Sequence, residues 1–327
     1  MNRRTAIRRL AIFFLTTASL AHAQQPKKLP LVGFLSGPSL ASIKPRTEAF
    51  RQGLRDLNYI EGQNISIEWR SAEGVDERLS NLVAELVQLK VDVILTQGTP
   101  ATQAAKNVTK TIPIIMAGVS DPVGTGLVAS LAHPGGNVTG FSTLQSDLGG
   151  KQLELLKEAF PKVSRVVVLW DPGNAGNVTW LGDMKVTAGA LRITLQSLEV
   201  HGPDDLEAAF PAMKKQRAGA ISVLSNAVTN THRTRIVDFA AKSKLPAMYP
   251  NREFVEIGGL MSYGPNPSDS YRRAAIYVDK ILKGTKPADL PVEQPMRFDF
   301  VINLKTAKQI GVTIPPNVLV RASRVIR

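Results

Sequence analysis

The sequence predicts an α/β protein with two similar lobes, each built around a parallel sheet. Short runs rich in Val, Ile and Leu alternate with helical patterns, which is typical of strands buried on both faces of such a sheet. The same order of three runs occurs twice, at 29–40, 91–99 and 112–121, then at 165–175, 219–227 and 245–253. Each run ends in small or polar residues. Because open α/β sheets bind ligands at the carboxyl ends of their strands, this pattern predicts a binding cleft between the lobes.

The first lobe begins with a strand at 29–35. Apolar residues at helical spacing predict helices at 43–57 and 75–89, and another helix begins near Pro100, since proline fits the first turn of a helix. The other strands of this lobe are predicted at 65–69, 91–95 and 112–117. An irregular stretch rich in Gly and Pro follows at 118–140, with a short strand at 141–144. We expect the chain to cross to the second lobe in this region.

The second lobe repeats the alternation. Its helices are predicted at 145–159, 177–191, 204–216 and 229–243, and its strands at 163–170, 193–198, 220–224, 247–249 and 260–263. Two prolines at 265 and 267 break the chain before a helix at 268–282. The proline-spaced segment 286–295 suits a stiff crossing between lobes. A strand at 298–302 and a helix at 304–310 complete the pattern.

Residues 1–23 have the three parts of a secretory signal peptide. Four arginines between positions 3 and 9 precede an apolar stretch too short to span a bilayer, and Ala21-His22-Ala23 forms an A-x-A cleavage site. We expect export and cleavage after Ala23; the general secretory and twin-arginine routes stay open. The chain contains no cysteine, so it has neither a disulfide nor a cysteine for a lipid anchor. The sequence therefore predicts a soluble, unanchored periplasmic protein.

The charge balance is basic. The formal net charge is +13, and it is +9 once the four signal-peptide arginines are removed (13 − 4). Lys and Arg are spread over the predicted helices, and neither an RNA-binding signature nor a Cys/His finger accompanies them. This distribution favours a solvated basic surface over a nucleic-acid partner.

The sequence lacks the constellations that enzymes and metal sites require. Ser142 follows Gly140 but lacks the second glycine of a nucleophile elbow, and Gly149-Gly150-Lys151 lacks the rest of a phosphate loop. The four histidines are scattered without metal-ligand spacing. We therefore expect that the protein is not an enzyme and that it binds neither a metal nor a cofactor.

Polar residues at the strand ends are candidate ligand contacts. Thr99 and Ser120, together with amides at helix starts, suit a ligand carboxylate. Asp121 and Asp171 each follow a strand and precede a proline. Each of these aspartates either pairs with a ligand ammonium group or caps the following turn, and one residue can do both.

Two tyrosines at strand ends have two interpretations. Tyr249 and Tyr263 either form an aromatic wall for the ligand or pack at the sheet edge. Together with the polar residues they make up the predicted ligand contacts. Lobe 1 contributes Ser36, Thr96, Gly98, Thr99, Ser120 and Asp121, and lobe 2 contributes Asp171, Asn174, Ser225, Asn226, Tyr249 and Tyr263.

Several blocks then point to a known family. They are SDPVGTGLV at 120–128, LAHPGGNVTG at 131–140, GGLMSYG at 258–264, and KPADLPVEQP at 286–295 with NLKTA at 303–307. In this order they resemble ABC-transporter substrate-binding proteins related to tryptophan- and tyrosine-binding importer components. The resemblance covers essentially the whole mature chain. Two departures, His133 in place of an arginine and a tail at 321–324 without the usual acidic pair, lie outside the predicted cleft.

The resemblance implies a type I periplasmic binding fold, with two Rossmann-like lobes, three crossovers and a ligand closed between them. Lobe 1 then comprises 29–142 plus 265–293, and lobe 2 comprises 143–264 plus 294–327. The implied function is capture of a small molecule, such as an amino acid or aromatic carboxylate, by a monomer that docks on an ABC permease. A ligand-sensing subunit of a signalling receptor and a two-lobed α/β enzyme stay open as alternatives, and the resemblance leaves the ligand unidentified.

Overall fold

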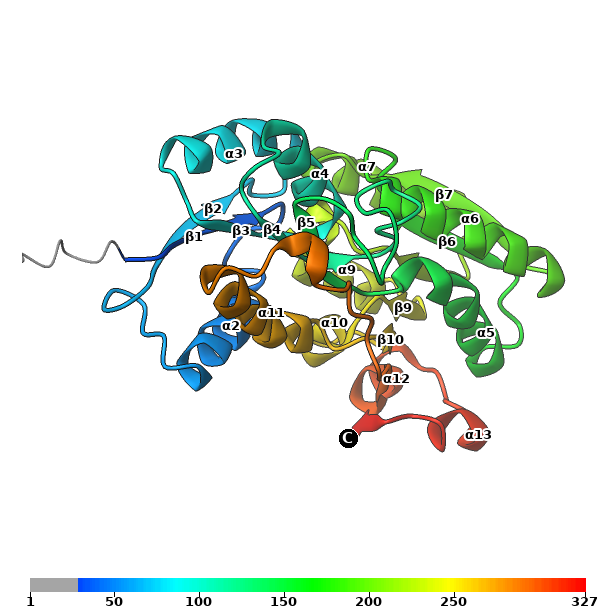
Figure 1. Ribbon diagram of the computed structural model, residues 1–327. Coiled ribbons are helices and arrows are strands. Elements are labelled where there is room, and N and C mark those ends of the chain that lie inside the picture. Colours follow the sequence, from blue (N-terminus) through cyan, green and yellow to red (C-terminus); the bar gives the residue numbers. More distant parts are fainter. Residues whose placement is uncertain (1–28) are drawn as a thin grey trace, which may run out of the picture.

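The computed structural model describes residues 29–327, apart from the side chain of Ser146, and contains two lobes (Figure 1). Each lobe has a central sheet covered by helices. The predicted signal peptide, residues 1–23, lies outside the described residues. Between residues 29 and 327, no helix is long and apolar enough to cross a membrane.

Lobe 1 is built on a five-stranded sheet with the order β2-β1-β3-β4-β5. Helices α3 and α4 pack on one face, and α2 and α11 lie side by side on the other (Figure 1). The strands are β1 (Leu31–Ser36), β2 (Ser66–Ser71), β3 (Val93–Gln97), β4 (Ile114–Val119) and β5 (Val138–Ser142). The helices are α2 (Lys44–Asp56), α3 (Leu79–Gln88), α4 (Gly98–Val108) and α11 (Pro267–Leu282), with 3-10 turns η1 (Asp76–Arg78) and η3 (Pro287–Asp289).

The strands of lobe 1 are apolar on both faces because helices cover both. Along β3, Val93 and Leu95 belong to the cluster that contains Phe50 of α2 and Tyr271 of α11. The intervening Ile94 belongs to the cluster under α3 and α4. Successive side chains of a strand point to opposite faces, so both sets must be apolar. The continuous apolar runs in the sequence follow from this arrangement.

Lobe 2 is built on a seven-stranded sheet with the order β12-β11-β10-β9-β8-β6-β7. Its strands are β6 (Arg165–Trp170), β7 (Thr194–Glu199), β8 (Ala220–Val223), β9 (Ala247–Tyr249), β10 (Met261–Gly264), β11 (Asp299–Asn303) and β12 (Arg324–Ile326). Its helices are α5 (Gly149–Ala159), α6 (Ala175–Ala190), α7 (Pro203–Lys215), α8 (Ala227–Thr231), α9 (Arg233–Lys242), α10 (Arg252–Glu256), α12 (Leu304–Ile310) and α13 (Pro316–Leu319), with the 3-10 turn η2 (Gln145–Leu148).

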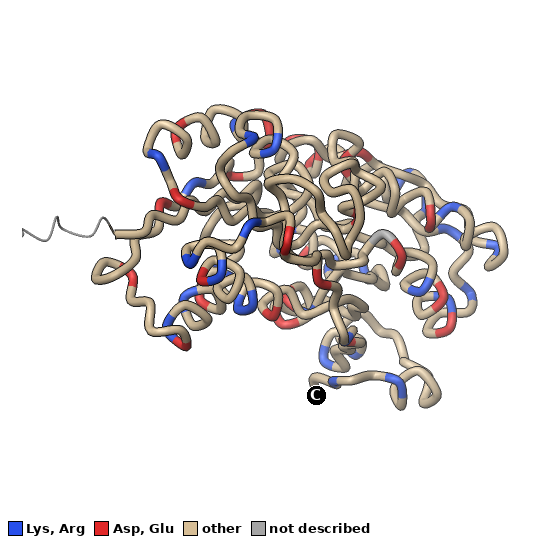
Figure 2. Tube along the Cα trace, in the orientation of Figure 1, with Lys and Arg blue, Asp and Glu red and all other residues tan. Residues whose placement is uncertain are grey.

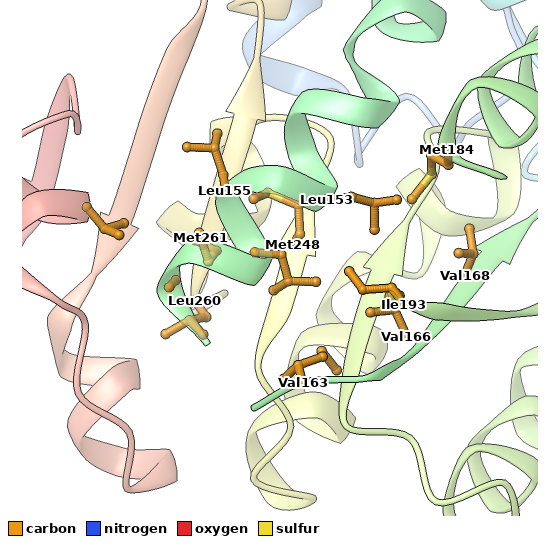
Figure 3. Close-up of a cluster of buried hydrophobic side chains, with 14 of the residues drawn as sticks. Leu153, Leu155, Val163, Val166, Val168, Met184, Ile193, Met248, Leu260 and Met261 are labelled. Carbon is orange, nitrogen blue, oxygen red and sulfur yellow. The ribbon is translucent and has the colours of Figure 1, made fainter. Parts of the chain in front are cut away.

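The core of lobe 2 repeats the two-faced packing. In Figure 3, Val166 and Val168 of β6 lie in one cluster with Leu153 of α5 and Met184 of α6. The intervening Val167 belongs to the cluster on the opposite face, under α7, α9 and α10. The predicted fold class, two α/β lobes around parallel sheets, is therefore confirmed, with one exception in this second sheet.

The exception is β11, which runs antiparallel to β10, whereas the sequence predicts parallel sheets throughout. Gly264, the last residue of β10, pairs with Asp299, the first residue of β11. The chain leaves β10 toward lobe 1 and returns from lobe 1 at that same end of the sheet. A strand that re-enters where its neighbour left must run the opposite way.

Other differences from the predicted elements are short. The helix predicted at 229–243 is split into α8 and α9 at His232, and α10, α13 and β12 are not predicted at all. Helix α4 begins at Gly98, two residues before Pro100, so that Thr99 lies inside its first turn. Pieces of three to five residues carry too little periodicity to be recognised, and packing against longer elements decides them.

The chain passes between the lobes three times, and the crossings lie together. The first crossing follows β5, the second lies between β10 and α11, and the third leads from η3 to β11. The third segment runs beside the end of β5. The amide of Ser142 donates to the carbonyl of Glu293 (2.9 Å), and the amide of Glu293 donates to the carbonyl of Gly140 (2.9 Å).

Charged residues are distributed over both lobes. Figure 2 shows Lys and Arg interspersed with Asp and Glu along the helices rather than gathered into one stripe. The carboxyl ends of the strands, where the lobes face each other, carry the groups described next.

Candidate functional site

Two adjoining cavities lie between the lobes. The larger, which we call the main chamber, has a volume of about 320 Å³. The smaller, the polar chamber, has a volume of about 30 Å³. Gln97 and Gly118 of lobe 1 and Gln145 and Ser225 of lobe 2 line both, so the chambers are neighbouring parts of one site.

The three crossings form much of the wall of the main chamber. They contribute Thr143 from the first crossing, Pro265 from the second and Met296 from the third. The guanidinium group of Arg273 lies 5.2 Å from the ring centre of Phe141 and forms an ion pair with Glu293. Ligand pockets are commonly about 300–1,000 Å³, and the main chamber is within this range. Its wall combines aromatic and proline surfaces with many polar side chains.

Tyr271 of α11 also lines the main chamber. Its side chain is buried, and its hydroxyl interacts with the guanidinium of Arg46 but donates no hydrogen bond within the described part of the chain. Burial raises the pKa of Tyr271 above its ordinary value, so the hydroxyl stays protonated. A buried hydroxyl that donates to no protein group and lies next to a cavity is able to donate to a bound molecule.

The polar chamber is formed where strands end and helices begin. Gly98 opens α4 in lobe 1 with a φ of 82°. Asn174 caps α6 in lobe 2, because its side-chain oxygen accepts from the amide of Gly176 (3.0 Å). The first turn of α4 and the cap residue of α6, Asn174, line this chamber. Amides at the start of a helix attract negative charge, so this side of the chamber is electropositive.

The two lobes approach each other closely at Gly176. A Cβ atom at this position would lie 2.2 Å from the hydroxyl oxygen of Ser120 and 3.0 Å from that of Thr99, both on the opposite lobe. Glycine is therefore required for this approach. Gly176 marks the contact across which the first turns of α4 and α6 face each other.

Asp76, in the turn η1 that precedes α3, supplies a negative charge to the polar chamber. Its Oδ1 atom is buried and has no hydrogen-bond partner between residues 29 and 327. Burial raises the pKa of Asp76 to about 7, and the nearby negative charges of Asp171 and Glu77 add to the effect.

A second buried carboxylate connects the lobes. Glu253 of lobe 2 accepts two hydrogen bonds from the guanidinium of Arg46 in lobe 1, at 3.0 and 2.7 Å. Asn230 of lobe 2 accepts a third from the same group at 3.1 Å. Both side chains of the ion pair are about 5% exposed or less. These contacts hold the lobes in a closed arrangement.

Half of the sequence-predicted residues line the polar chamber. These are Gly98, Thr99, Ser120, Asn174, Ser225 and Asn226. They come from both lobes, in agreement with the rule that polar strand ends meet at the cleft.

The other polar residues predicted for the site line neither chamber. The hydroxyl of Ser36 donates to the carbonyl of Pro38 (2.7 Å), and that of Thr96 pairs with Thr102 (2.8 Å). Asp121 accepts from the amide of Gly124 (2.8 Å). These side chains form hydrogen bonds within nearby turns and helix starts.

Asp171 also stabilises the turn in which it lies. Its carboxylate accepts from the amide of Gly173 (2.8 Å) and lies 3.8 Å from the Nδ1 atom of His201. Burial raises the pKa of Asp171, while the Gly173 amide and His201 act in the opposite direction. Asp171 lines neither chamber, and it influences the polar chamber through its charge.

Both predicted tyrosines pack against protein. Tyr249 is 1% exposed and stacks on Phe254 in the core of lobe 2. Tyr263 contacts the rings of Phe298 and Phe300. Neither lines a chamber, so the packing interpretation describes the two side chains in this structure.

Sequence reasoning missed several lining residues. Arg46, Gln97, Gln145 and Tyr271 lie on helices or strands that read as ordinary packing segments. The position of Asp76 could have indicated a site residue, because Asp76 follows the end of β2 just as the other candidates follow their strands. An acidic residue at a helix start is common, however, and therefore does not stand out.

The donor set gives no sign of a metal centre. Among residues 29–327, no group of three or more His, Cys, Asp or Glu side chains is placed to hold an ion. The chemistry that the two chambers offer is therefore hydrogen bonding, charge pairing and apolar contact.

Comparisons with known proteins agree with this geometry. The family model described as "ABC transporter substrate binding protein" matches residues 28–326. A curated relative, the tyrosine-binding protein of Clostridioides difficile, is 28% identical over 291 residues, which cover 88% of this chain and 82% of that protein.

Solved structures give the same result. A conserved domain protein from Vibrio cholerae is 30% identical with a TM-score of 0.85, covering 91% of this chain and 100% of that one. An ABC domain in complex with L-Trp from Streptococcus pneumoniae is 30% identical with a TM-score of 0.81, covering 90% and 100%. A 5-methylthioribose transporter solute-binding protein from Thermotoga lettingae, 14% identical with a TM-score of 0.61 over 91% and 93%, shares the fold. The architecture is the type I periplasmic binding fold.

Proposed function

The chain belongs to the family of ABC transporter substrate-binding proteins, and from that premise we propose that it captures an amino acid with a large apolar side chain. Proteins of this family bind small molecules outside the cytoplasm and work with a membrane permease. The observation that carries the proposal is the pair of adjoining chambers between the lobes: a larger one whose wall includes Phe141, Tyr271 and several prolines, and a small polar one. An amino acid has the same division into an apolar side chain and a charged head group.

Two relatives support this choice of ligand class. The relative from Clostridioides difficile is named for tyrosine binding, and the structure from Streptococcus pneumoniae holds L-Trp. The identities of 28% and 30% leave room for a different amino acid in this protein. The size of the main chamber, about 320 Å³, is at the lower end of the usual range for ligand pockets and suits one such molecule.

We propose a specific placement for the ligand. Its carboxylate lies at the first turns of α4 and α6, where Thr99, Ser120 and Asn174 line the polar chamber. Its side chain extends into the main chamber, toward Phe141 and Tyr271. Helix-start amides favour an anion, and aromatic walls favour an apolar group. In this placement the lobes close over the ligand, as in other proteins that work by hinge closure.

The remaining parts of the proposal concern the protein's role in the cell. We propose a periplasmic monomer, cleaved after Ala23 and free of a lipid anchor, whose lobes divide at 142, 264 and 293. It delivers its ligand unchanged to a permease rather than to a sensory receptor. Deletion of the gene should then abolish high-affinity uptake of the ligand by the host; unchanged uptake with an altered transcriptional response would favour sensing.

Calorimetry on the mature protein tests the ligand class. We expect L-tryptophan or L-tyrosine to bind with one site per chain and to be recovered chemically unchanged after long incubation. A ligand at about a hundred times its dissociation constant should add roughly 2.7 kcal/mol to the free energy of unfolding. Absence of binding by every aromatic amino acid would refute the proposed class, and an altered ligand would refute the carrier role.

A pair of glutamine variants tests the location. Gln97 lines both chambers, whereas Gln103, on the next helix, bonds to Asn107 at the surface (3.0 Å). Gln97→Ala should weaken binding by about 3- to 15-fold, the usual worth of one hydrogen bond. Gln103→Ala should leave the dissociation constant unchanged. Equal affinities in both variants would place the ligand elsewhere.

A further inference from the structure

We infer that Asp76 binds a positively charged group of the ligand, so that the site selects an ammonium group in addition to a carboxylate. The inference rests on the proposed function, because it identifies the second charged contact of the same site. Sequence reasoning assigns this contact to Asp121 or Asp171, and neither lines the chambers.

The position of Asp76 is the first argument. Its carboxylate lines the polar chamber between a glycine of lobe 1 and the first turn of α8 in lobe 2. A Cβ atom on Gly37 would lie 2.9 Å from Oδ1 of Asp76 and 3.2 Å from Cβ of Ala227. The lack of a side chain at Gly37 thus leaves Oδ1 room at the junction of the lobes. The oxygen is buried, and Asp76 lines the chamber.

The charges around Asp76 are the second argument. The charged groups that act on its carboxylate, Asp171 and Glu77, are both negative. The guanidinium of the adjacent Arg78 is directed to the carbonyl of Ala72 (3.4 Å). His201 lies beside Asp171, at 3.8 Å. Within residues 29–327, Oδ1 of Asp76 has no hydrogen-bond partner.

Burial of a carboxylate without a cation is unfavourable, and proteins normally pair such groups. The raised pKa of Asp76, about 7, reflects this unfavourable environment in the ligand-free protein. A ligand ammonium group would supply the missing cation. A ligand hydroxyl could donate a hydrogen bond but would leave the charge uncompensated beside Asp171.

The helix starts in the wall of the polar chamber are the third argument. The first turn of α4 makes its part of the wall electropositive, while Asp76 makes its own part electronegative. The chamber therefore has two poles, and its volume of about 30 Å³ accommodates only small polar groups. The head group of an α-amino acid carries both charges on one carbon atom, so it complements both poles at once.

The test compares two probes that differ only at the amine. L-Tryptophan carries an ammonium group, and L-indole-3-lactate carries a hydroxyl in its place. We expect wild-type protein to prefer L-tryptophan by about 30-fold or more, the usual effect of losing one partner of a buried charge pair. Asp76→Asn should lose that preference. Glu77→Gln, which removes the same charge from an exposed side chain on the same turn, should keep it.

A ligand-free measurement makes the inference independent of the probe. The folded pKa of Asp76 is raised above the unfolded value, so the wild type should lose stability as the pH rises from about 4 to about 7. Asp76→Asn should therefore unfold at a higher temperature than wild type at about pH 8, and the difference should vanish near about pH 4. Glu77→Gln removes only the smallest of the three causes of the raised pKa of Asp76, so its pH-dependent gain should be smaller than that of Asp76→Asn.

The outcomes separate the two proposals. If wild type binds L-tryptophan but Asp76→Asn binds it equally well, or Asp121→Asn alone loses affinity, the inference is overturned and the proposed function stands. Equal binding of both probes by wild type also overturns it. If neither probe binds, the proposed aromatic ligand class fails, and the thermal measurement then tests the inference about Asp76. An unchanged unfolding temperature for Asp76→Asn at about pH 8 overturns the inference, and a higher unfolding temperature supports it.

Discussion

Glu253 and Asp76 are both carboxylates buried where the lobes meet, and they differ in their surroundings. Glu253 is held by Arg46 through two hydrogen bonds. Burial by itself would raise the pKa of Glu253, but the charges of Arg46, Arg233 and Arg252 and the Arg46 hydrogen bonds lower it below the ordinary value. Asp76 has two negative neighbours, and its pKa is raised to about 7.

The difference separates structural groups from ligand-binding groups. A buried carboxylate whose cation comes from the opposite lobe stabilises the closed arrangement without any ligand. A buried carboxylate at a cavity with no hydrogen bond to its Oδ1 atom, as found for Asp76 within residues 29–327, leaves the pairing to a bound molecule. The same contrast between paired and unpaired polar groups yields three further predictions.

The largest effect is expected from breaking the paired carboxylate. Glu253→Gln leaves the guanidinium of Arg46 buried without its charge partner, which typically costs about 3–5 kcal/mol. Because the two residues lie on different lobes, the protein can avoid this cost by opening. We expect a larger radius of gyration by small-angle X-ray scattering and weaker binding of L-tryptophan.

The pH dependence of the Arg46–Glu253 pair has a defined sign. The folded pKa of Glu253 is lowered, so its stabilisation is present above the unfolded value of about 4.5 and is lost as the pH falls through the folded value. Wild type should therefore open in acid, and the variant should not change. Glu48→Gln serves as the control, because Glu48 is 49% exposed and its ion pair with Arg51 (2.9 Å) should contribute less than about 1 kcal/mol. An unchanged radius for Glu253→Gln would contradict the role of the pair in closure.

An intermediate effect is expected at the close approach of the lobes. Gly176→Ala puts a Cβ atom 2.2 Å from the hydroxyl oxygen of Ser120, and overpacking of this kind typically costs about 1–3 kcal/mol. We expect the lobes to stay further apart and the affinity for L-tryptophan to fall.

Gly182 on the same helix is the matched control. A Cβ atom there would meet no described atom within 4 Å, so Gly182→Ala should stabilise the helix by about 0.5–1 kcal/mol without changing affinity. If Gly176→Ala binds as tightly as wild type, the ligand-bound lobes do not approach as closely as in this structure.

The smallest effect separates two buried tyrosine hydroxyls. The hydroxyl of Tyr277 donates to the carbonyl of Pro291 (2.7 Å), whereas that of Tyr271 donates no hydrogen bond in the described part of the chain. Tyr277→Phe should lower the free energy of unfolding by about 1 kcal/mol, and Tyr271→Phe should raise it slightly in the ligand-free protein. Urea denaturation measures both. A loss of stability for Tyr271→Phe would show that its hydroxyl donates to a partner after all.

The fold was largely predictable because its cause is local. The run at 93–95 is apolar at every position, since helices cover both faces of the sheet. This apolar pattern can be recognised without knowing which helices pack against the strand. The direction of β11 was not predictable, because it depends on where the chain re-enters the sheet after visiting lobe 1.

The site was predictable only in outline. The rule that polar strand ends meet at the cleft found Thr99, Ser120 and Asn174 in the polar chamber. It also selected Tyr249, which packs in the core, because a strand-end tyrosine has the same local sequence whether it faces protein or cavity. It passed over Asp76, whose position at a helix start looks ordinary.

The sequence by itself determined the two α/β lobes and the polar residues at the strand ends of each, which form its polar rim. Buried strands and their ends can be recognised from local sequence patterns. The tertiary structure decided which residues of the rims face each other. Arg46 and Glu253 are 207 positions apart, and only the closed arrangement of the lobes joins them. In the same arrangement, Oδ1 of Asp76 is buried without a hydrogen-bond partner among residues 29–327. Charge compensation depends on distances between remote segments, and these exist only once the chain has folded.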